Sequence, residues 1–240
     1  MIKLTVLGSG SKGNSTYLNV NGYEMLLDAG FSYKEIKKRL ACIDKNIENI
    51  KAILVSHEHL DHVQALPMFR KNNIRIYSEA GGNVVPEREI HIRNTGIKIM
   101  PFRLSHDGKC VGYRIEHQDF SLLYIVDTGC IPEEAMAHCF GATAILFEFN
   151  YDLVKLTENQ KYPTELMERV AGEEGHMDNI ESKRILKELD HDKLELVMCM
   201  HLSQQNNNTQ LVRYEAGLAV KNTKIAVGVQ NILSKMFFFV

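Results

Sequence analysis

Four side chains that can bind metal ions occur within six residues, as His57, His59, Asp61 and His62. They follow the apolar run 51–56, which is typical of a buried strand. Alternate residues of an extended turn point the same way, so His57 and His59 can share one ion. Asp61 and His62 fall where the chain bends into a helix and can serve a second ion. Because imidazole and carboxylate suit Zn²⁺ and Mn²⁺, and Fe²⁺ as well, we expect two divalent metal ions per chain.

Three further metal-capable side chains stand at the ends of other apolar runs. They are His106, Asp127 and His201, and each directly follows a strand-like segment. Open α/β sheets place their chemistry at the carboxyl ends of strands, so we expect all three to join the metal site. The remaining histidines lack this placement, and we expect surface positions or local hydrogen bonds for His91, His117, His138 and His191.

The elements that must position these side chains alternate between strand and helix patterns. Runs rich in β-branched and aromatic residues predict strands at 2–7, 16–20, 24–27, 52–55, 97–102, 110–115, 121–126, 142–147, 194–200 and 224–227. Helices are predicted at 33–40, 63–71, 163–171, 179–189 and 206–220. The helix after Asp178 opens on the spacing of a capping box, with Glu181 in the fourth position. This order predicts an α/β fold in which two mixed β-sheets are flanked by helices.

A glycine-rich stretch near the start of the chain partly matches two nucleotide-binding motifs. Residues 8–13 match the dinucleotide fingerprint, but a strand-like run follows instead of the helix that the motif requires. A P-loop is excluded as well, because Asn14 stands where Lys is needed. We predict a tight turn between two strands. Lys12 at its tip is a candidate for touching a substrate phosphate.

The composition is that of an ordinary globular protein. Of the 240 residues, 45% are hydrophobic and 24% are charged, and the formal net charge is −2. No repeat or long linker divides the chain, so we expect a single domain over residues 1–240. The five cysteines form no Cys-x-x-Cys pair, which argues against a disulfide framework and a zinc ribbon. With no signal peptide and no long apolar run, we expect a cytoplasmic protein without a membrane partner. The Phe-rich C-terminus is expected to pack on a core or a partner, and the oligomeric state stays open, a homodimer included.

The metal-binding residues resemble those of the metallo-β-lactamase superfamily in type, order and spacing. The resemblance rests on the His-x-His-x-Asp-His run, on the three later strand ends and on Leu26-Leu27-Asp28-Ala29-Gly30. It implies an αββα sandwich with a dinuclear metal site at one edge, and a supporting role for Asp28 outside the ligand set. It also implies that His57, His59 and His106 hold the first ion, that Asp61, His62 and His201 hold the second, and that Asp127 bridges them.

Two metal ions suit hydrolysis, because a hydroxide that bridges them is a nucleophile at neutral pH. The resemblance extends to superfamily phosphodiesterases that process RNA 3′ ends, in which a Glu and a His help to protonate the leaving oxygen. Here Glu148 follows a strand-like run and His176 precedes the capped helix. We expect Asp61, Glu148 and His176 to be the catalytic side chains.

Within the superfamily the chain most resembles the bacterial YycJ/WalJ (VicX) branch. The resemblance is carried by residues 8–14, by Ser105-His106-Asp107, by Gly175-His176 and by His201-Leu202-Ser203. Tyr151 departs from this branch, which has His there. The resemblance implies a metal-dependent DNA exonuclease that acts from 5′ ends, with nucleic acid as its partner. Two alternatives stay open: a small-molecule hydrolase (thioesterase, lactonase or cyclic phosphodiesterase), and a metal-binding regulatory protein.

Overall fold

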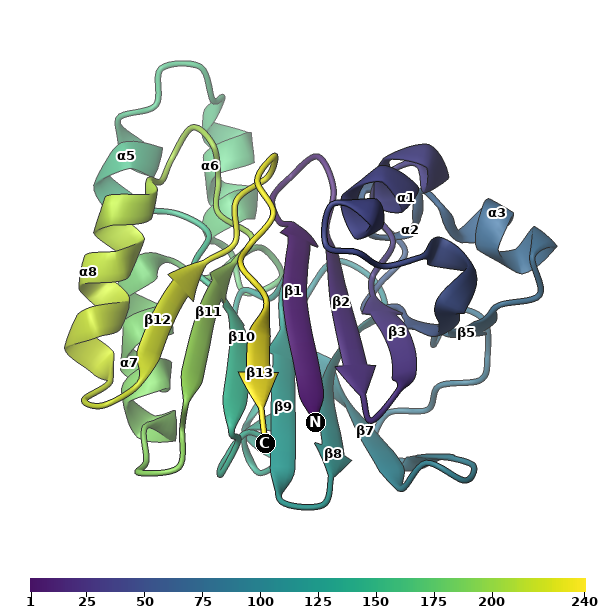
Figure 1. The fold of residues 1–240 in the computed structure, drawn as a ribbon. Coiled ribbons are helices and arrows are strands. Elements are labelled where there is room, and N and C mark those ends of the chain that lie inside the picture. The colour runs from purple at the N-terminus through teal and green to yellow at the C-terminus, as the bar shows by residue number, and fades with distance from the viewer.

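Two β-sheets packed face to face form the centre of the protein, as the computed structural model of residues 1–240 shows (Figure 1). The six-stranded sheet contains, in spatial order, β13 (Phe237–Phe239), β1 (Ile2–Gly8), β2 (Ser15–Val20), β3 (Tyr23–Leu27), β4 (Ile50–Leu54) and β5 (Arg75–Tyr77). The seven-stranded sheet contains β12 (Lys224–Val227), β11 (Leu196–Met200), β10 (Ala144–Glu148), β9 (Phe120–Ile125), β8 (Cys110–His117), β7 (Ile97–Leu104) and β6 (Ile90–Ile92).

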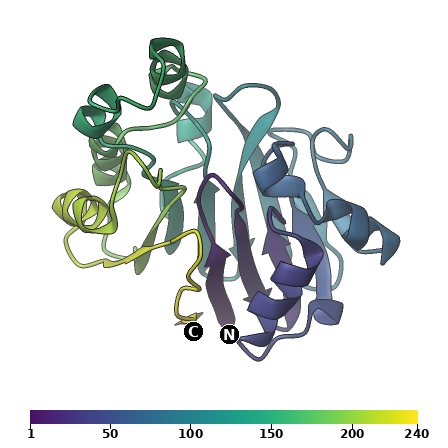
Figure 2. The same ribbon diagram turned by 90° about the horizontal axis from the view of Figure 1, so that it is seen from above.

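Helices cover both outer faces of this sandwich (Figure 2). On the side of the first sheet lie α1 (Tyr33–Ala41), α2 (Leu60–Val63) and α3 (Leu66–Lys71), with a 3₁₀ turn at Ile47–Asn49. On the side of the second lie α4 (Glu133–Met136), α5 (Leu153–Thr157), α6 (Thr164–Ala171), α7 (Asn179–Leu189) and α8 (Thr209–Ala219). The αββα architecture predicted from the sequence is confirmed.

Three apolar cores hold the four layers together. The largest has 28 buried residues and fills the space between the two sheets. A second core of 24 residues lies between the second sheet and its helices, and one of 14 residues lies under α1 and α3. Strands buried on both faces read as continuous apolar runs, which explains why the sequence revealed β9, β10 and β11 so clearly.

Strand direction brings the predicted site residues to one edge of the sandwich. Strands β9, β10, β11 and β12 are parallel neighbours, and β7 runs in the same direction because β8 is antiparallel to both β7 and β9. In the first sheet β3, β4 and β5 are parallel. The carboxyl ends of β4, β7, β9, β10 and β11 therefore deliver their following residues to the same region.

Several element boundaries differ from the sequence-based prediction. The helix expected at 63–71 is two helices, since α2 begins at Leu60 and Pro67 starts a new helix at the first turn of α3. Helix α8 starts at Thr209, because the Asn208 side chain accepts a hydrogen bond from the Leu211 amide and caps it. The short strands β5, β6 and β13 were not predicted.

The capping box is only half formed. The Asp178 carboxylate accepts hydrogen bonds from the amides of Ile180 and Glu181, at 2.6 and 2.9 Å. The Glu181 side chain does not reach back, because it pairs with Arg184 one turn later. One half of the motif is enough to start α7 at the predicted residue.

The C-terminal phenylalanines pack on the core between the sheets. Strand β13 pairs antiparallel with β1 and buries Phe237 and Phe239, while Phe238 between them is exposed. All five cysteines are free, and three of them are buried. None of the helices combines the length and the apolar character that crossing a membrane would require.

Candidate metal centre

Three of the site residues adopt an unusual backbone conformation within two residues of the end of a strand. Asp28, Asp127 and His201 have φ angles of 58°, 54° and 56°, in the left-handed region that non-glycine residues rarely occupy. Each is fully or almost fully buried. Such strain is kept where the surroundings fix it, and it is frequent at functional sites. Here it turns each side chain from the strand end toward the common edge.

Three imidazoles form the first group. The ligand-capable atoms of His57, His59 and His106 all lie within 4.8 Å of one another. The Nδ1 of His59 lies 3.4 Å from the Nε2 of His106. His57 lies three residues after the end of β4, His59 precedes α2 and His106 follows β7. Residues from both sheets thus converge on one point.

The second group combines carboxylates with imidazoles. Ligand-capable atoms of Asp61, His62 and His201 also lie within 4.8 Å of one another. Asp127 lies beside them, with Oδ2 2.9 Å from the Nε2 of His62 and Oδ1 3.1 Å from the Nδ1 of His201. A further grouping joins Asp127 to His57 and His62. Asp127 is therefore the one carboxylate within reach of both groups.

Each imidazole has one nitrogen held by a neighbour outside the cluster. In His57 it is Nδ1, 3.1 Å from the Ser56 hydroxyl, and in His106 it is Nδ1, 3.1 Å from the Gly175 carbonyl oxygen. The Nε2 of His59 lies 3.1 Å from Asp107. The Nδ1 of His62 lies 2.7 Å from Asp28, and the Nδ1 of His201 lies 3.1 Å from Glu148. Metal-binding histidines are usually fixed in this way, with the other nitrogen left for the ion.

Asp28 is the centre of a buried network behind His62. Its carboxylate accepts hydrogen bonds from the amide and the hydroxyl of Ser56, both at 2.8 Å, and from the Tyr124 hydroxyl at 2.7 Å. With all these partners satisfied, Asp28 does not face the cluster itself. It sets the orientation of the His62 ring.

The free nitrogens show that the residues fit metal ions. The Nε2 atoms of His57 and His201 are buried and have no hydrogen-bond partner. A buried polar atom without a partner costs about 1–3 kcal/mol, so such atoms need an explanation. A bound cation supplies it, since both atoms belong to groups of convergent imidazoles and carboxylates.

The cluster also has unusual electrostatics. Burial lowers the pKa of His57 well below its usual range, and the neighbouring His62 adds to this. For His201 burial acts in the same direction, but Asp127, Asp61 and Glu148 outweigh it and raise the pKa to about 10. Asp127 keeps a pKa well below its usual range despite its burial, because His201 and His62 stabilise its charge. Without metal, protonated imidazoles balance the buried carboxylates.

Glu148 and His176 lie together at the border of the cluster. The Nδ1 of His176 is 2.8 Å from Oε1 of Glu148, the last residue of β10. Glu148 is completely buried, and its other oxygen accepts a hydrogen bond from the Thr128 amide at 2.8 Å. Burial opposes its charge, but His176 and His201 hold the pKa of Glu148 below its usual value. The His176 ring is partly exposed, and its Nε2 has no partner within the protein.

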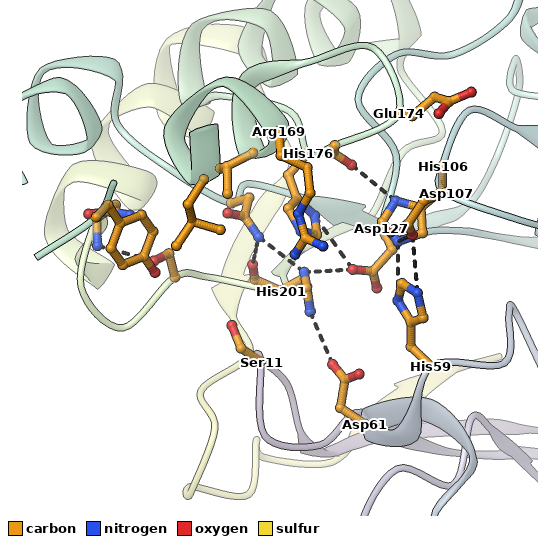
Figure 3. A pocket seen from close by; sticks show the side chains of 17 residues that line it. Ser11, His59, Asp61, His106, Asp107, Asp127, Arg169, Glu174, His176 and His201 are labelled. Atoms are coloured by element: carbon orange, nitrogen blue, oxygen red, sulfur yellow. Dashed lines mark hydrogen bonds and ion pairs between the residues drawn. The ribbon is translucent and has the colours of Figure 1, made fainter. Parts of the chain in front are cut away.

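A cleft of about 270 Å³ opens onto these residues. Figure 3 shows its labelled side chains, with His59 and Asp61 on one side and Arg169 and His176 on the other. Residues of α6 and its preceding turn form the outer wall, among them Tyr162 and Leu166. Lys12 does not line this cleft. It is exposed at the tip of the β1–β2 turn, as predicted, and its backbone amide donates to Gln230.

Two residues that the sequence did not single out hold Asp61 in place. The Asn14 amide donates to the Asp61 carbonyl oxygen at 2.7 Å, and the Asn14 side chain donates to the Asp61 carboxylate at 3.3 Å. Gly30 packs on the same carbonyl, where a Cβ would lie 1.5 Å from the oxygen. Asn14 and Gly30 drew attention as members of sequence motifs, and Asn14 also as the residue that breaks a P-loop, but nothing in the sequence indicated their contacts with Asp61.

Sequence comparison adds a family and two named relatives. Residues 8–83 match the metallo-beta-lactamase superfamily. The chain is 27% identical over 244 residues to Exodeoxyribonuclease YycJ of Bacillus anthracis, covering 95% of this chain and 92% of that protein. It is 29% identical over 246 residues to Exodeoxyribonuclease WalJ of Streptococcus pneumoniae, covering 95% and 91%.

Solved structures share the architecture at low sequence identity. The metallo-beta-lactamase fold protein YhfI from Bacillus subtilis superposes with a TM-score of 0.73 at 17% identity, covering 98% of this chain and 100% of that chain. A diphosphatase from the PhnP family gives a TM-score of 0.68 at 16% identity, with 98% of each chain covered. At these identities the likeness concerns the fold.

Proposed function

Because residues 8–83 match the metallo-beta-lactamase superfamily and two relatives along 95% of the chain are named exodeoxyribonucleases, we propose that the chain is a metal-dependent phosphodiesterase that hydrolyses nucleic acid. The substrate that we propose is DNA, degraded from 5′ ends. Two relatives that match along 95% of the chain are named exodeoxyribonucleases, which supports DNA as the substrate. The direction of degradation rests on the resemblance to the YycJ/WalJ branch alone.

The proposed ligands of two divalent ions are the residues of the two groups. His57, His59 and His106 would hold one ion, Asp61, His62 and His201 the other, and Asp127 both. Zn²⁺ and Mn²⁺ suit these imidazole and carboxylate donors, and so does Fe²⁺. When bound, two such ions would act as Lewis acids and lower the pKa of water to about 7, which supplies a hydroxide nucleophile.

The observation that best supports phosphodiesterase activity is the Glu148–His176 pair. Cleavage of a phosphodiester expels an alkoxide, which is a poor leaving group unless a proton reaches its oxygen. The His176 Nδ1 is fixed on the buried Glu148 carboxylate, and His176 lines the cleft with its Nε2 unpaired. Nε2 can therefore hold a proton for the leaving oxygen, a role that contributes about 10²–10⁴-fold in rate.

The role of His176 is tested by the leaving group. We expect His176→Ala to keep its bound metal but to lose about 10²–10⁴-fold on DNA, with a much smaller loss on bis-p-nitrophenyl phosphate, whose leaving group needs no proton. The matched control is His191→Ala, which removes a histidine that bonds to the Ala142 carbonyl oxygen just before the amino-terminal end of β10, away from the site. Equal slowing of both substrates would contradict the proton-donor role.

A substrate panel separates this function from its alternatives. Metal-loaded protein is incubated with single- and double-stranded DNA and, in parallel, with thioesters and lactones. We expect chelator-sensitive loss of DNA with little ester turnover. Ester or lactone turnover with intact DNA would favour a small-molecule hydrolase. A metal-loaded protein that is inert on every substrate would favour a regulatory role.

A further inference from the structure

The outer wall of the cleft carries a cation that the proposed metal chemistry does not use. Arg169 is the only Lys or Arg side chain among the 17 residues that line the cleft. It is exposed and forms no ion pair or hydrogen bond, although Glu174 lines the same cleft. Among the other exposed arginines only Arg103 and Arg184 pair with acids, so Arg169 is distinguished by its place in the cleft. An unpaired guanidinium in an otherwise acidic cleft is available for a negatively charged ligand.

The backbone fixes Arg169 relative to the proposed proton donor. The His176 amide donates to the Val170 carbonyl oxygen at 2.9 Å, which ties the last turn of α6 to the His176 segment. Gly175 packs so closely on this turn that a Cβ would lie 2.2 Å from the Arg169 carbonyl oxygen. In Figure 3 the two side chains lie on the same side of the cleft. A substrate whose leaving oxygen reaches His176 therefore passes Arg169.

An aromatic side chain completes this wall. Tyr162 lies in the turn before α6, lines the cleft and is partly exposed, and its hydroxyl has no partner within the protein. Aromatic faces beside a cationic groove are the usual means of binding single-stranded nucleic acid, because every base can stack on them.

The wall continues into a second hollow. This hollow of about 590 Å³ has no hydrophobic lining and includes Lys155 and Lys161. It adjoins the cleft at Asn159, whose side chain donates to Asn206 of the cleft at 2.5 Å. A strand that leaves the cleft over Tyr162 meets these two lysines next.

Resting on the proposed function, we propose that Arg169 and Tyr162 form a nucleotide subsite for single-stranded nucleic acid. Arg169 binds a phosphate next to the scissile one, and Tyr162 stacks on a base. The cleft volume lies just below the roughly 300–1,000 Å³ of ordinary small-ligand pockets, which suits one nucleotide unit. The subsite thus selects a frayed or single-stranded end.

The decisive experiment compares salt dependence in two arginine variants. Arg169→Gln is matched by Arg70→Gln, because Arg70 also lies in the last turn of a helix and is exposed, but outside the cleft. We measure kcat/KM of the metal-loaded proteins on a single-stranded oligonucleotide at several salt concentrations. In Arg169→Gln, kcat/KM should fall about tenfold. The slope of log kcat/KM against log salt concentration should become shallower by about 0.7, the value for one phosphate of a single strand. Arg70→Gln should match the wild type.

Two further readouts make the inference specific. Bis-p-nitrophenyl phosphate has no neighbouring phosphate, so Arg169→Gln should hydrolyse it at the wild-type rate. Tyr162→Ala should lower kcat/KM on the oligonucleotide by about 5- to 100-fold, and Tyr162→Phe should restore it, because stacking needs only the ring.

The outcomes separate this inference from the proposed function. If the wild type cleaves the oligonucleotide but Arg169→Gln keeps its salt slope, the subsite is wrong and the nuclease stands. If Arg169→Gln lowers kcat/KM on bis-p-nitrophenyl phosphate as much as on the oligonucleotide, Arg169 acts at the scissile phosphate and the assignment is overturned. A wild type that leaves the oligonucleotide intact overturns the proposed function and the subsite together.

Discussion

At the scale of single residues, the centre is defined by what lies behind each imidazole. Five histidines present one nitrogen to the cluster, and carboxylates, a hydroxyl and a carbonyl hold the other nitrogen. These outer partners fix ring orientation before any ion arrives. The sequence predicted which of these side chains would gather at one edge, because they follow apolar strands or stand in the turn after one. The partners could not be predicted, since contacts such as that between Tyr124 and Asp28 join residues 96 positions apart.

The residue behind His62 provides the first prediction. Asp28→Asn keeps the size of the side chain but removes the charge that orients the ring, so metal affinity should fall about 10- to 100-fold. Titration against a competing chelator measures this loss. The control is Asp119→Asn, an exposed carboxylate in the turn between β8 and β9. An unchanged affinity in Asp28→Asn would contradict the supporting role.

The shifted pKa values lead to a prediction about pH. The pKa of His201 is raised to about 10 in the metal-free protein, so its imidazole is protonated at pH 7 and must lose this proton to bind an ion. Calorimetric titrations with Zn²⁺ in buffers of different ionisation heat should reveal proton release, and affinity should rise with pH. A heat that does not depend on the buffer would contradict this.

The same shift affects the stability of the metal-free protein. Because the pKa of His201 is higher in the folded than in the unfolded state, its protonation stabilises the fold. This contribution to the free energy of unfolding is complete below the unfolded-state pKa of about 6.5 and is lost as the pH rises through about 10. The melting temperature of the metal-free protein should therefore fall across this window. Metal-loaded protein should lack this loss, because its histidines are already neutral.

At the scale of elements, loops that meet at close range position the proposed ligands. Gly30 and Asn14 clamp the backbone of Asp61, so the segment after β3 and the β1–β2 turn both determine where α2 starts. Gly30→Ala should lower the free energy of unfolding by about 2–3 kcal/mol, because its Cβ has no space. Gly217→Ala is the control, since a Cβ in α8 meets only ordinary contact and should stabilise by about 0.5–1 kcal/mol. Denaturant unfolding measures both. A mild effect of Gly30→Ala would contradict the clamp.

The last strand offers a second prediction at this scale. Phe239→Ala should cost about 3 kcal/mol of stability, because its ring is buried against Phe120 in the core between the sheets. Phe238→Ala should change stability little, since its side chain points to solvent. Equal melting temperatures of the two variants would show that β13 does not contribute to the core.

Long elements were predictable because burial leaves a clear pattern in sequence. Strands buried on both faces, such as β9 to β11, appear as apolar runs. The edge strands β5, β6 and β13 are too short to show such a pattern, since each has only three residues. Each becomes a strand because a neighbouring strand pairs with it. Helix α6 was predictable as an element, but its place as the wall of the cleft was not, since none of its residues is buried.

At the scale of the whole molecule, two sheets contribute strand ends to one centre. Neither sheet alone holds either of the two proposed ligand groups, because the residues after β4 come from the first sheet and those after β7, β9 and β11 from the second. The chain has a net charge of only −2, so overall charge does not attract DNA. We infer that bound metal ions and local cations such as Arg169 supply the positive field, which predicts that cleavage weakens as salt rises.

The most direct test of the central claim follows the two ends of a labelled DNA strand. Metal-loaded protein is incubated with oligonucleotides labelled at the 5′ or the 3′ end, with and without chelator, beside His59→Ala and the control His91→Ala, whose histidine is exposed and pairs with Glu89. We predict early release of the 5′ label as a small product and gradual shortening of 3′-labelled strands, abolished by chelator and by His59→Ala alone. Internal fragments from both labels, or full activity in His59→Ala, would contradict a metal-dependent exonuclease acting from 5′ ends.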